Sequence, residues 1–487
     1  MLITLSKVIT TSILLLLPGS SFAFDSKTAP LSVDQLKAEL EKLYLSDDAK
    51  DIFWGVDVVR IKDGAELFSL NKNKRFRPAS NMKVVIAASA LKALNSDHRF
   101  ETNLFTDGKI KNGVVEGNLV VVGSGDPTFK GSELSAWRTS LQKLGVTRVK
   151  GNIVGIDSMF DDQKTGLMWS WDDLSNCYSA QISGLQVNSN CAEVIIRPGL
   201  DGEQAIIQKI PNTSYIEAIN QTVTGHSPTN LEFKREEGTN RIYIRGIINK
   251  RASSIGKWIS VDNPTLYFVH LFYEELSRHG IKVEGRPVDS RDTGYILKRS
   301  SAYQIAKRRS PPLRSIINDF LKYSINLYGE SILKSLGFIY FNDGSTYNGR
   351  LAVDLILKPY NLPKDVLFIA DGSGLSMLNM ISPEYMSKLL YSISKGYYYQ
   401  TFFDALSTSG MDGTLRRRLN SEELKGNVHA KTGYIRNVRS LSGYIDTVGK
   451  ERLVFSIFAN NYNNKLDKAE FVIDKTCRLL RSYGGEK

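Results

Sequence analysis

Residues 77–94, RPASNMKVVIAASALKAL, place a serine and a lysine three positions apart at the start of an apolar run. Pro78 follows a polar stretch, and the residues after Lys83 are apolar at helical spacing, so we expect a helix that begins near Pro78. Ser80 then lies in the first turn, where backbone N–H groups are free and the helix dipole is positive. Lys83 lies one turn further on the same face, so the two side chains are expected to meet.

This placement suggests a chemistry. An ammonium group among Val84, Val85 and other apolar residues is partly desolvated, which lowers the pKa of the lysine. A neutral amine can take the proton of a serine hydroxyl, so a nucleophile can form without histidine. The segment therefore predicts Ser80 as a nucleophile and Lys83 as its base.

The Ser-x-x-Lys spacing by itself has little specificity, because most copies in a chain rich in both residues lie on solvated helix faces. The spacing occurs seven times here, starting at Ser69, Ser80, Ser89, Ser140, Ser254, Ser331 and Ser392. Other motifs must distinguish the functional copy from the accidental ones.

Two further motifs follow Ser80 in the chain: Ser-x-Asn at 324–326 and Lys-Thr-Gly at 431–433. Each has an earlier copy, at 69–71 and at 164–166. Only the later copies give the order Ser-x-x-Lys, Ser-x-Asn, Lys-Thr-Gly. We therefore take 80, 324 and 431 as the starts of the functional set.

This ordered trio is the signature of penicillin-binding proteins and β-lactamases. Because 244 positions separate Ser80 from Ser324, the chain resembles the low-molecular-mass class C penicillin-binding proteins, the D-alanyl-D-alanine carboxypeptidase/endopeptidase family, in which extra domains are inserted there. Other stretches resemble that family as well: LVVVGSGDPTF at 119–129, DGSGLSMLNMISP at 371–383, DGTLRRR at 412–418 and AKTG at 430–433. The likeness covers nearly the whole chain after residue 23.

The resemblance implies a role for each catalytic residue. Ser80 would form an acyl-enzyme with the penultimate D-alanine of a peptidoglycan stem peptide, after Lys83 takes its proton. Ser324 would relay a proton to the departing D-alanine nitrogen. Asn326 would hydrogen-bond Lys83 and the substrate backbone.

The third motif is implied to bind the substrate and the developing charge. Lys431 and Thr432 would attract the terminal carboxylate, and the charge of Lys431 would discourage a proton on Lys83. Gly433 would let a substrate strand lie close to the backbone, and the N–H groups of Ser80 and Tyr434 would form the oxyanion hole.

Three positions depart from the family pattern: Tyr434 replaces a small hydroxyl residue, Ile325 a common aspartate and Met377 an expected basic residue. None removes a catalytic group, but Tyr434 puts a side-chain contact to the substrate carboxylate in doubt.

The resemblance and the strand and helix patterns predict an α/β (α+β) fold, with a β-lactamase/transpeptidase-like catalytic domain whose antiparallel sheet is flanked by helices. We expect this domain at 24–100 and 290–487, an inserted β-rich domain II at 101–199 and 252–289, and an inserted domain III at 200–251. AYQIAKRR at 302–309 and the segment 313–337 are expected to be long helices. The glycine-rich texture after residue 100 favours short strands.

Residues 1–23, MLITLSKVITTSILLLLPGSSFA, have the lysine, apolar core and small-residue end of an export signal. No later stretch approaches the length of a membrane span, so no integral membrane segment is expected after signal removal. We expect a soluble periplasmic protein. The formal charge of +12 is spread along the chain, so no nucleic-acid partner is indicated.

The chain has three cysteines. In an exported protein Cys177 and Cys191 are expected to form a disulfide, closing a loop worth about 3 kcal/mol, whereas Cys477 in an apolar helical segment is expected to be free and buried. Five scattered histidines offer no metal spacing, and we expect no cofactor. We expect Trp169 and Trp171 to be packing residues, although a binding surface on the inserted part is possible.

Two other functions remain open from sequence. A β-lactamase would use the same nucleophile but hydrolyse its acyl-enzyme quickly; the inserted domains argue against it. A non-catalytic wall-binding protein could retain the fold, but the complete set of motif residues argues against that. With a penicillin-binding enzyme, peptidoglycan peptides are the expected partners and β-lactams the expected covalent inhibitors.

Overall fold

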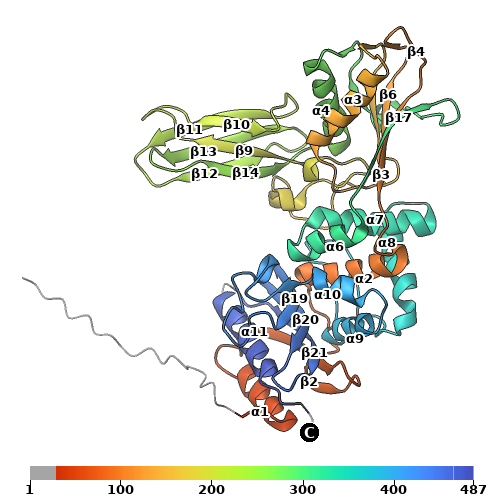
Figure 1. Ribbon diagram of the computed structural model, residues 1–487. Helices are drawn as coiled ribbons and strands as arrows, with labels where there is room; N and C mark the ends of the chain where they lie inside the picture. Colours follow the sequence, from red (N-terminus) through yellow and green to blue (C-terminus); the bar gives the residue numbers. More distant parts are fainter. Residues whose placement is uncertain (1–28, 464–465, 486–487) are drawn as a thin grey trace, which may run out of the picture.

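The structure is a computed structural model that describes residues 29–463 and 466–485. One sheet and most of the helices form one end of an elongated molecule, and several smaller sheets form the other end (Figure 1). The predicted export signal at 1–23 lies outside the described residues. Among the residues that are described, none of the helices is both long and apolar enough to span a membrane.

The large sheet has six strands, all antiparallel, in the order β18-β19-β20-β21-β1-β2. Strands from the two ends of the chain pair with each other, because β1 lies between β2 and β21. The strand bounds are β1 Phe53–Arg60, β2 Glu66–Leu70, β18 Ser407–Thr408, β19 Val428–Ile435, β20 Val438–Asp446 and β21 Arg452–Asn460. This arrangement confirms the expected antiparallel sheet built from distant segments.

Helices cover both faces of this sheet. The terminal helices α1 (Val33–Tyr44) and α11 (Leu466–Arg481) pack on one face in a common hydrophobic core. The other face is covered by a second core that contains α2, α6, α7, α8, α9 and α10. Their bounds are α2 Met82–Leu94, α6 Leu313–Lys322, α7 Asn326–Phe341, α8 Thr346–Leu357, α9 Pro383–Ser394 and α10 Tyr399–Ala405.

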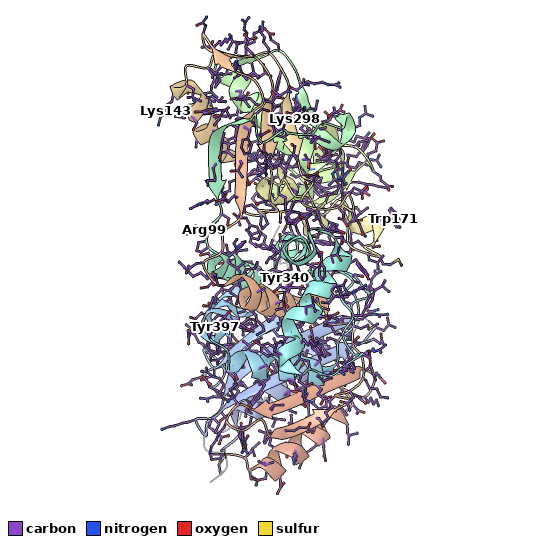
Figure 2. All side chains as sticks on the ribbon, turned by 90° about the vertical axis from the view of Figure 1, so that its right-hand side faces the viewer. Arg99, Lys143, Trp171, Lys298, Tyr340 and Tyr397 are labelled. Carbon is purple, nitrogen blue, oxygen red and sulfur yellow. A yellow bond between two sulfur atoms is a disulfide. The ribbon has the colours of Figure 1, made fainter. Side chains whose placement is uncertain are left out.

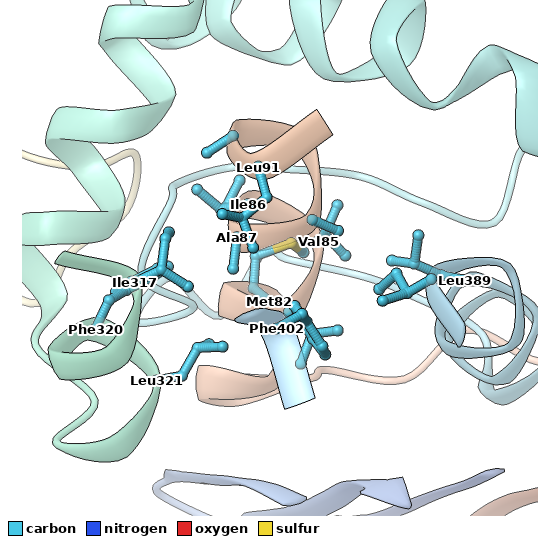
Figure 3. Packing of buried hydrophobic residues seen from close by; sticks show 14 of the residues in the cluster. Met82, Val85, Ile86, Ala87, Leu91, Ile317, Phe320, Leu321, Leu389 and Phe402 are labelled. Atoms are coloured by element: carbon cyan, nitrogen blue, oxygen red, sulfur yellow. The ribbon is translucent and has the colours of Figure 1, made fainter. Parts of the chain in front are cut away.

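Helix α2 lies in the middle of this second core. Its sequence is apolar on all sides, as expected of a helix surrounded by protein, and eleven of its thirteen residues are buried. Figure 3 shows α2 packed between neighbouring helices, with Met82, Val85 and Ile86 near Ile317, Phe320 and Leu321 of α6, Leu389 of α9 and Phe402 of α10. The helix that carries Lys83 is therefore held rigidly.

The residues after 100 form a mixed five-stranded sheet in the order β16-β8-β6-β3-β17, beside a four-stranded sheet, β15-β7-β5-β4. Helices α3 (Leu134–Lys143) and α4 (Pro264–Arg278) pack in the core of this part. The strand bounds are β3 Glu101–Thr106, β4 Ile110–Lys111, β5 Val114–Val115, β6 Leu119–Val122, β7 Arg148–Val149, β8 Ile153–Ile156, β15 Lys282–Val283, β16 Pro287–Asp289 and β17 Tyr303–Arg309. A short helix, α5 (Ser290–Thr293), follows β16.

The expected helix at 302–309 is wrong, because Tyr303–Arg309 is strand β17, at the edge of the five-stranded sheet. It pairs with β3, and this tertiary pairing outweighs the weak helical tendency of AYQIAKRR. The expected long helix at 313–337 is also interrupted. Ser324, between α6 and α7, has a φ of +59°, which a regular helix cannot contain.

An arm of two three-stranded sheets, β10-β9-β14 and β11-β13-β12, projects from this part (Figure 1). The strand bounds are β9 Cys191–Arg197, β10 Ile206–Ile210, β11 Glu217–Gly225, β12 Asn230–Arg235, β13 Arg241–Asn249 and β14 Ile255–Ser260. The arm shares one continuous hydrophobic core with the five-stranded sheet and α4.

The cysteines follow the prediction. Cys177 and Cys191 form a disulfide with a Cα–Cα distance of 5.8 Å, and Cys477 is free and buried in α11. The disulfide ties a 3-10 turn, η4 (Cys177–Ser179), to the start of β9. A loop that faces the catalytic end is thereby fixed to the arm.

Candidate active site

Ser80 lies in a 3-10 turn, η1 (Ala79–Asn81), that leads directly into α2. The Nζ atom of Lys83 is 2.8 Å from the Oγ atom of Ser80. The expected meeting of the two side chains at the start of an apolar helix is therefore present. Ser80 is partly exposed, whereas Lys83 is completely buried.

Three oxygen atoms surround the Lys83 amine. Besides Ser80, Nζ donates to Oδ1 of Asn326 at 2.7 Å and to the backbone carbonyl of Ser373 at 2.5 Å. A neutral amine has two N–H groups, which these two acceptors can take, and its lone pair then remains for the Ser80 proton. The geometry suits a base directed at Ser80.

Burial lowers the pKa of Lys83 to about 7, while the nearby carboxylates of Asp371 and Glu330 act in the opposite direction. Lys431 is likewise buried, and its pKa is lowered well below the usual value by desolvation and by the charge of Lys83. Desolvation is the main cause at Lys83, so the neutral amine is accessible near neutral pH.

The carbonyl of Ser373 reaches Lys83 because its loop, within DGSGLS, is fixed by hydrogen bonds from its backbone N–H groups to two buried carboxylates. Glu330 of α7 accepts the backbone N–H groups of Gly372 and Ser373 at 2.9 and 2.8 Å. Asp371 accepts the N–H groups of Gly374 at 2.7 Å and of Ser376 at 2.6 Å. This stretch resembles the family in sequence, but its role in holding the Ser373 carbonyl next to Lys83 could not be predicted from the sequence.

Gly374 lets the same loop approach the Ser80 turn. Its φ is +83°, in the left-handed region that favours glycine, and a Cβ atom there would lie 1.9 Å from the carbonyl oxygen of Ala79. A side chain at this position would push the loop and the turn apart. The glycine-rich pattern of DGSG was the sequence signal for this contact.

Asn326 is the first residue of α7, and its side chain bridges two parts of the molecule. Its Oδ1 accepts from Lys83, and its Nδ2 donates to the backbone carbonyl of Tyr178 at 2.7 Å. Ser324 precedes it in the left-handed turn, and within the described residues its hydroxyl has no hydrogen-bond partner. The structure therefore joins Asn326 to the Ser80–Lys83 pair directly, but not Ser324.

The Lys-Thr-Gly motif lies in the middle of β19. The amine of Lys431 donates to the carbonyl of Thr432 at 2.9 Å, and the hydroxyl of Thr432 donates to that of Thr414 at 2.8 Å. Thr414 belongs to the stretch DGTLRRR, which therefore contacts the motif directly. No direct hydrogen bond joins Lys431 to Ser80 or Ser324 within residues 29–463 and 466–485.

Gly433 also has a reason within the protein itself, beside the substrate contact expected of it. A Cβ atom there would lie 2.1 Å from Oγ of Ser440 and 2.7 Å from the carbonyl oxygen of Pro78. The missing side chain therefore lets β19 approach the turn that carries Ser80, whose neighbour Asn81 donates to Ser440 at 2.6 Å. The glycine serves the closeness of two protein segments.

Tyr434 is 63% exposed and lies directly opposite Arg439 in the β19–β20 pairing. The guanidinium carbon of Arg439 is 3.4 Å from the centre of the Tyr434 ring, and Arg439 is itself paired with Glu470 of α11 at 3.1 Å. The ring is thus held by stacking on a buried arginine, and no small hydroxyl group is present at this position.

The inserted part reaches the site through the segment that contains Trp169 and Tyr178. The indole of Trp169 donates to Asp371 at 2.8 Å, and the Tyr178 carbonyl accepts from Asn326 as described. Trp169 has the expected packing role, since its partly buried side chain packs against a small hydrophobic cluster. It is wrong for Trp171, which is 72% exposed.

The chain is similar to known proteins. The sequence pattern of the D-Ala-D-Ala carboxypeptidase 3 (S13) family matches residues 36–478 of this chain. The D-alanyl-D-alanine carboxypeptidase of Actinomadura sp. (strain R39) is 31% identical over 97% of this chain and 89% of that protein.

Solved structures agree in fold. Penicillin binding protein 4 (dacB) from Haemophilus influenzae superposes with a TM-score of 0.80 at 26% identity, covering 90% of this chain and 99% of that chain. A second structure of that protein, complexed with a β-lactam, gives 0.74 at 25% identity, covering 91% and 98%. With its residues 36–478 matched, the chain belongs to the D-Ala-D-Ala carboxypeptidase 3 (S13) family.

Proposed function

We propose that this protein is a serine D-Ala-D-Ala carboxypeptidase that acts on peptidoglycan stem peptides through an acyl-enzyme on Ser80. The observation that carries the proposal is the buried amine of Lys83, 2.8 Å from the Ser80 hydroxyl and with its pKa lowered to about 7. The membership of the S13 family supports the same reaction.

In the first step neutral Lys83 takes the proton of Ser80, whose oxygen attacks the carbonyl carbon of the penultimate D-alanine. The carbonyl oxygen gains the negative charge, and the backbone N–H groups of Ser80 and Tyr434 stabilise it. The positive end of the short turn and α2 adds to this stabilisation.

The intermediate then collapses as the bond between carbonyl carbon and nitrogen breaks. Ser324 passes its proton to the departing nitrogen and regains one from the Lys83 ammonium, so D-alanine leaves with a neutral amino group and Lys83 becomes neutral again. Water attacks the ester with Lys83 as base, which releases the shortened peptide and restores Ser80. Among residues 29–463 and 466–485 the Ser324 hydroxyl has no hydrogen-bond partner, which leaves it available for this relay.

The substrate carboxylate is assigned to Lys431 and Thr432. The Thr432 hydroxyl, which donates to Thr414 in the free protein, would turn its proton to the carboxylate, and the buried Lys431 amine would be held protonated by that negative charge. Tyr434 contributes its backbone N–H, while its ring, stacked on Arg439, leaves carboxylate recognition to the other two residues.

The same residues explain covalent inhibition by β-lactams. Ser80 attacks the strained lactam carbonyl, but the leaving nitrogen stays tethered after ring opening and hinders the approach of water. The Haemophilus protein has been solved in complex with a β-lactam, which supports this assignment. A β-lactamase would instead turn penicillin over rapidly, so the ratio of turnover to stoichiometric labelling separates the two functions.

We further propose endopeptidase activity on cross-bridges, because acylation at a D-alanine carbonyl serves either reaction. Pentapeptide monomer and cross-linked dimer, incubated separately with the enzyme and analysed by chromatography, test the two activities. Release of D-alanine or cleavage of the dimer is expected. Inertness towards both, in a protein that is folded, would contradict a hydrolase and favour a non-catalytic wall-binding protein.

The domain limits are also a proposal. Because β17 pairs with β3, we place the return to the catalytic domain near residue 310 instead of 290. Because β10 pairs with β9, we extend the arm to about 191–260 instead of 200–251. The predicted export signal and the family's cell-wall substrates support a periplasmic location, which cell fractionation tests.

A further inference from the structure

A large cleft lies away from Ser80, between the loop that contains Trp171 and the outer face of β12 and β13. Its volume is about 940 Å³, at the upper end of the range for small-molecule sites. The catalytic roles proposed above use none of its lining residues. Figure 2 shows Trp171 at the edge of the molecule, about midway along its long axis.

The walls of the cleft offer aromatic surface. Trp171, in the 3-10 turn η3 (Trp171–Asp173), is 72% exposed, and the Nζ atom of Lys234 lies 5.8 Å from its ring. Across from it, Tyr243 forms a cross-strand pair with Lys234, and the guanidinium carbon of Arg245 is 5.2 Å from the Tyr243 ring. Aromatic rings that stay exposed on a concave surface are characteristic of binding sites.

The cleft also offers hydrogen-bonding groups that the protein does not fully use. Arg235, of which 7% is exposed, donates to the carbonyl of Thr239 at 2.8 Å and lies 3.7 Å from Asp262. Its Nε–H has no partner within the part of the chain that the structure describes. A buried donor without an acceptor is costly, and a ligand oxygen reached by a small shift of this guanidinium would satisfy it.

The charge of the lining indicates the kind of ligand. Five acidic and three basic side chains line the cleft, a formal excess of two negative charges. Peptidoglycan stem peptides carry free carboxylates and would be repelled. A neutral sugar has an apolar C–H face that can lie on an indole or phenol ring, and hydroxyl and amide groups that can bond charged and amide side chains.

From these observations we infer that the cleft binds a neutral carbohydrate of the N-acetylhexosamine type, as found in the glycan strand of the wall. The segment that forms the cleft continues to Tyr178, whose carbonyl accepts from Asn326 in the active site. A glycan held against Trp171 would therefore bring its attached peptides close to Ser80. The inference goes beyond the proposed function, since sugar binding does not require acylation.

The test is a binding titration of the full-length mature protein with a β-1,4-linked N-acetylglucosamine tetramer. Trp171→Ala is expected to weaken binding by about tenfold or more, because an aromatic platform is lost. Trp258→Ala is the matched control: this tryptophan is 49% exposed on β14 and is not part of the cleft lining. Its binding is expected to equal that of the unchanged protein.

A second measurement compares substrates. Trp171→Ala is expected to lose activity on intact wall sacculi while soluble cross-linked dimer is cleaved at the unchanged rate. The rate of penicillin labelling, read in parallel, reports folding and the Ser80 site separately from the cleft. If Trp171→Ala does not fold, Tyr243→Ala replaces it in both measurements.

Several results would overturn the inference. The tetramer fails to bind the unchanged protein, or Trp171→Ala binds it as tightly as the unchanged protein does. A sugar-free stem tripeptide that binds instead of the tetramer, and is lost in Trp171→Ala, would identify a peptide site. Loss of sugar binding with normal penicillin labelling in Trp171→Ala supports the inference and leaves the proposed function untouched.

Discussion

The Ser-x-x-Lys spacing occurs twice between the start of turn η1 and the end of helix α2, at Ser80–Lys83 and at Ser89–Lys92, and the two copies behave differently. In the first, Lys83 is buried and 2.8 Å from the Ser80 oxygen. In the second, Ser89 donates to the carbonyl of Val85 at 2.9 Å, and the Lys92 amine lies 4.7 Å from the ring of Tyr360. The same spacing therefore gives a fully buried lysine beside a serine hydroxyl in the first copy, and a partly buried lysine beside a tyrosine ring in the second.

The difference comes from what packs on each end of the helix. The N-terminal end meets the Ser373 loop, Asn326 and β19, which bury the lysine and supply acceptors for its N–H groups. The other copy lies at the C-terminal end, where Lys92 is only partly buried and its serine bonds back to the helix. Desolvation and preorganised acceptors, rather than sequence spacing, make the reactive pair.

The largest expected effect is that of Ser80→Ala. Removing the nucleophile leaves no oxygen to form the ester, so covalent labelling by a fluorescent penicillin is abolished. Labelling is read on a denaturing gel, with circular dichroism as the folding control. Ser89→Ala is the matched variant and is expected to label normally; labelling that survives in Ser80→Ala would identify another nucleophile.

Exchange of the lysines tests the comparison directly. Lys83→Ala is expected to slow acylation by about 10²-fold to 10⁴-fold, the usual cost of losing a general base. Lys92→Ala is expected to leave the rate nearly unchanged. Acylation rates are measured by quenching the labelling reaction after a series of times at several penicillin concentrations. Equal rates in the two variants would make Lys83 an ordinary helix residue.

Gly374→Ala tests whether the close approach of the Ser373 loop creates the site. The new Cβ would meet the Ala79 carbonyl at 1.9 Å, whereas at Gly202, with a nearly equal φ of +84°, nothing lies within 4 Å. Gly374→Ala is therefore expected to lower the free energy of unfolding by about 1–3 kcal/mol more than Gly202→Ala, and to slow acylation as well. Denaturant unfolding and labelling of both variants decide it.

The pH dependence of acylation tests whether burial sets the pKa of Lys83. Because the pKa of Lys83 is lowered to about 7, the neutral amine increases as pH rises, and acylation is expected to rise about tenfold per pH unit below pH 7 and to level off above it. Burial and Asp371 raise the pKa of Glu330 itself to about 7, so Glu330→Gln removes a negative charge near Lys83 that is present above this pH, and should shift the upper part of the rise to lower pH. A rise centred near pH 10, the range of an exposed lysine, would contradict this account.

The smallest expected effect concerns Tyr434. Tyr434→Thr places a hydroxyl beside the substrate carboxylate, and the added hydrogen bond is expected to lower KM for a D-Ala-D-Ala peptide by about threefold to tenfold. Tyr434→Phe keeps the ring on Arg439 and should behave like the unchanged enzyme. If threonine leaves KM as it was, the position does not contact the carboxylate.

Much of the fold and site follows from sequence, but not all. The paired strands near both ends, helix α2 and the disulfide could be predicted because periodicity and cysteine spacing are local. The strand β17 could not, because its partner β3 lies about 200 positions earlier. Nor could the break at Ser324, whose positive φ interrupts the helical pattern between α6 and α7 and has no glycine to signal it in the sequence.

The sequence by itself selected the residues that are proposed to carry the chemistry: the order of three short motifs picked Ser80, Ser324 and Lys431 from many copies. Only the tertiary structure decided that Lys83 is fully buried, that the Ser373 carbonyl and Asn326 meet its amine, and that Tyr178 of the inserted part reaches Asn326. The physical reason is that a pKa depends on desolvation and on neighbouring charges, and both come from segments far apart in the chain.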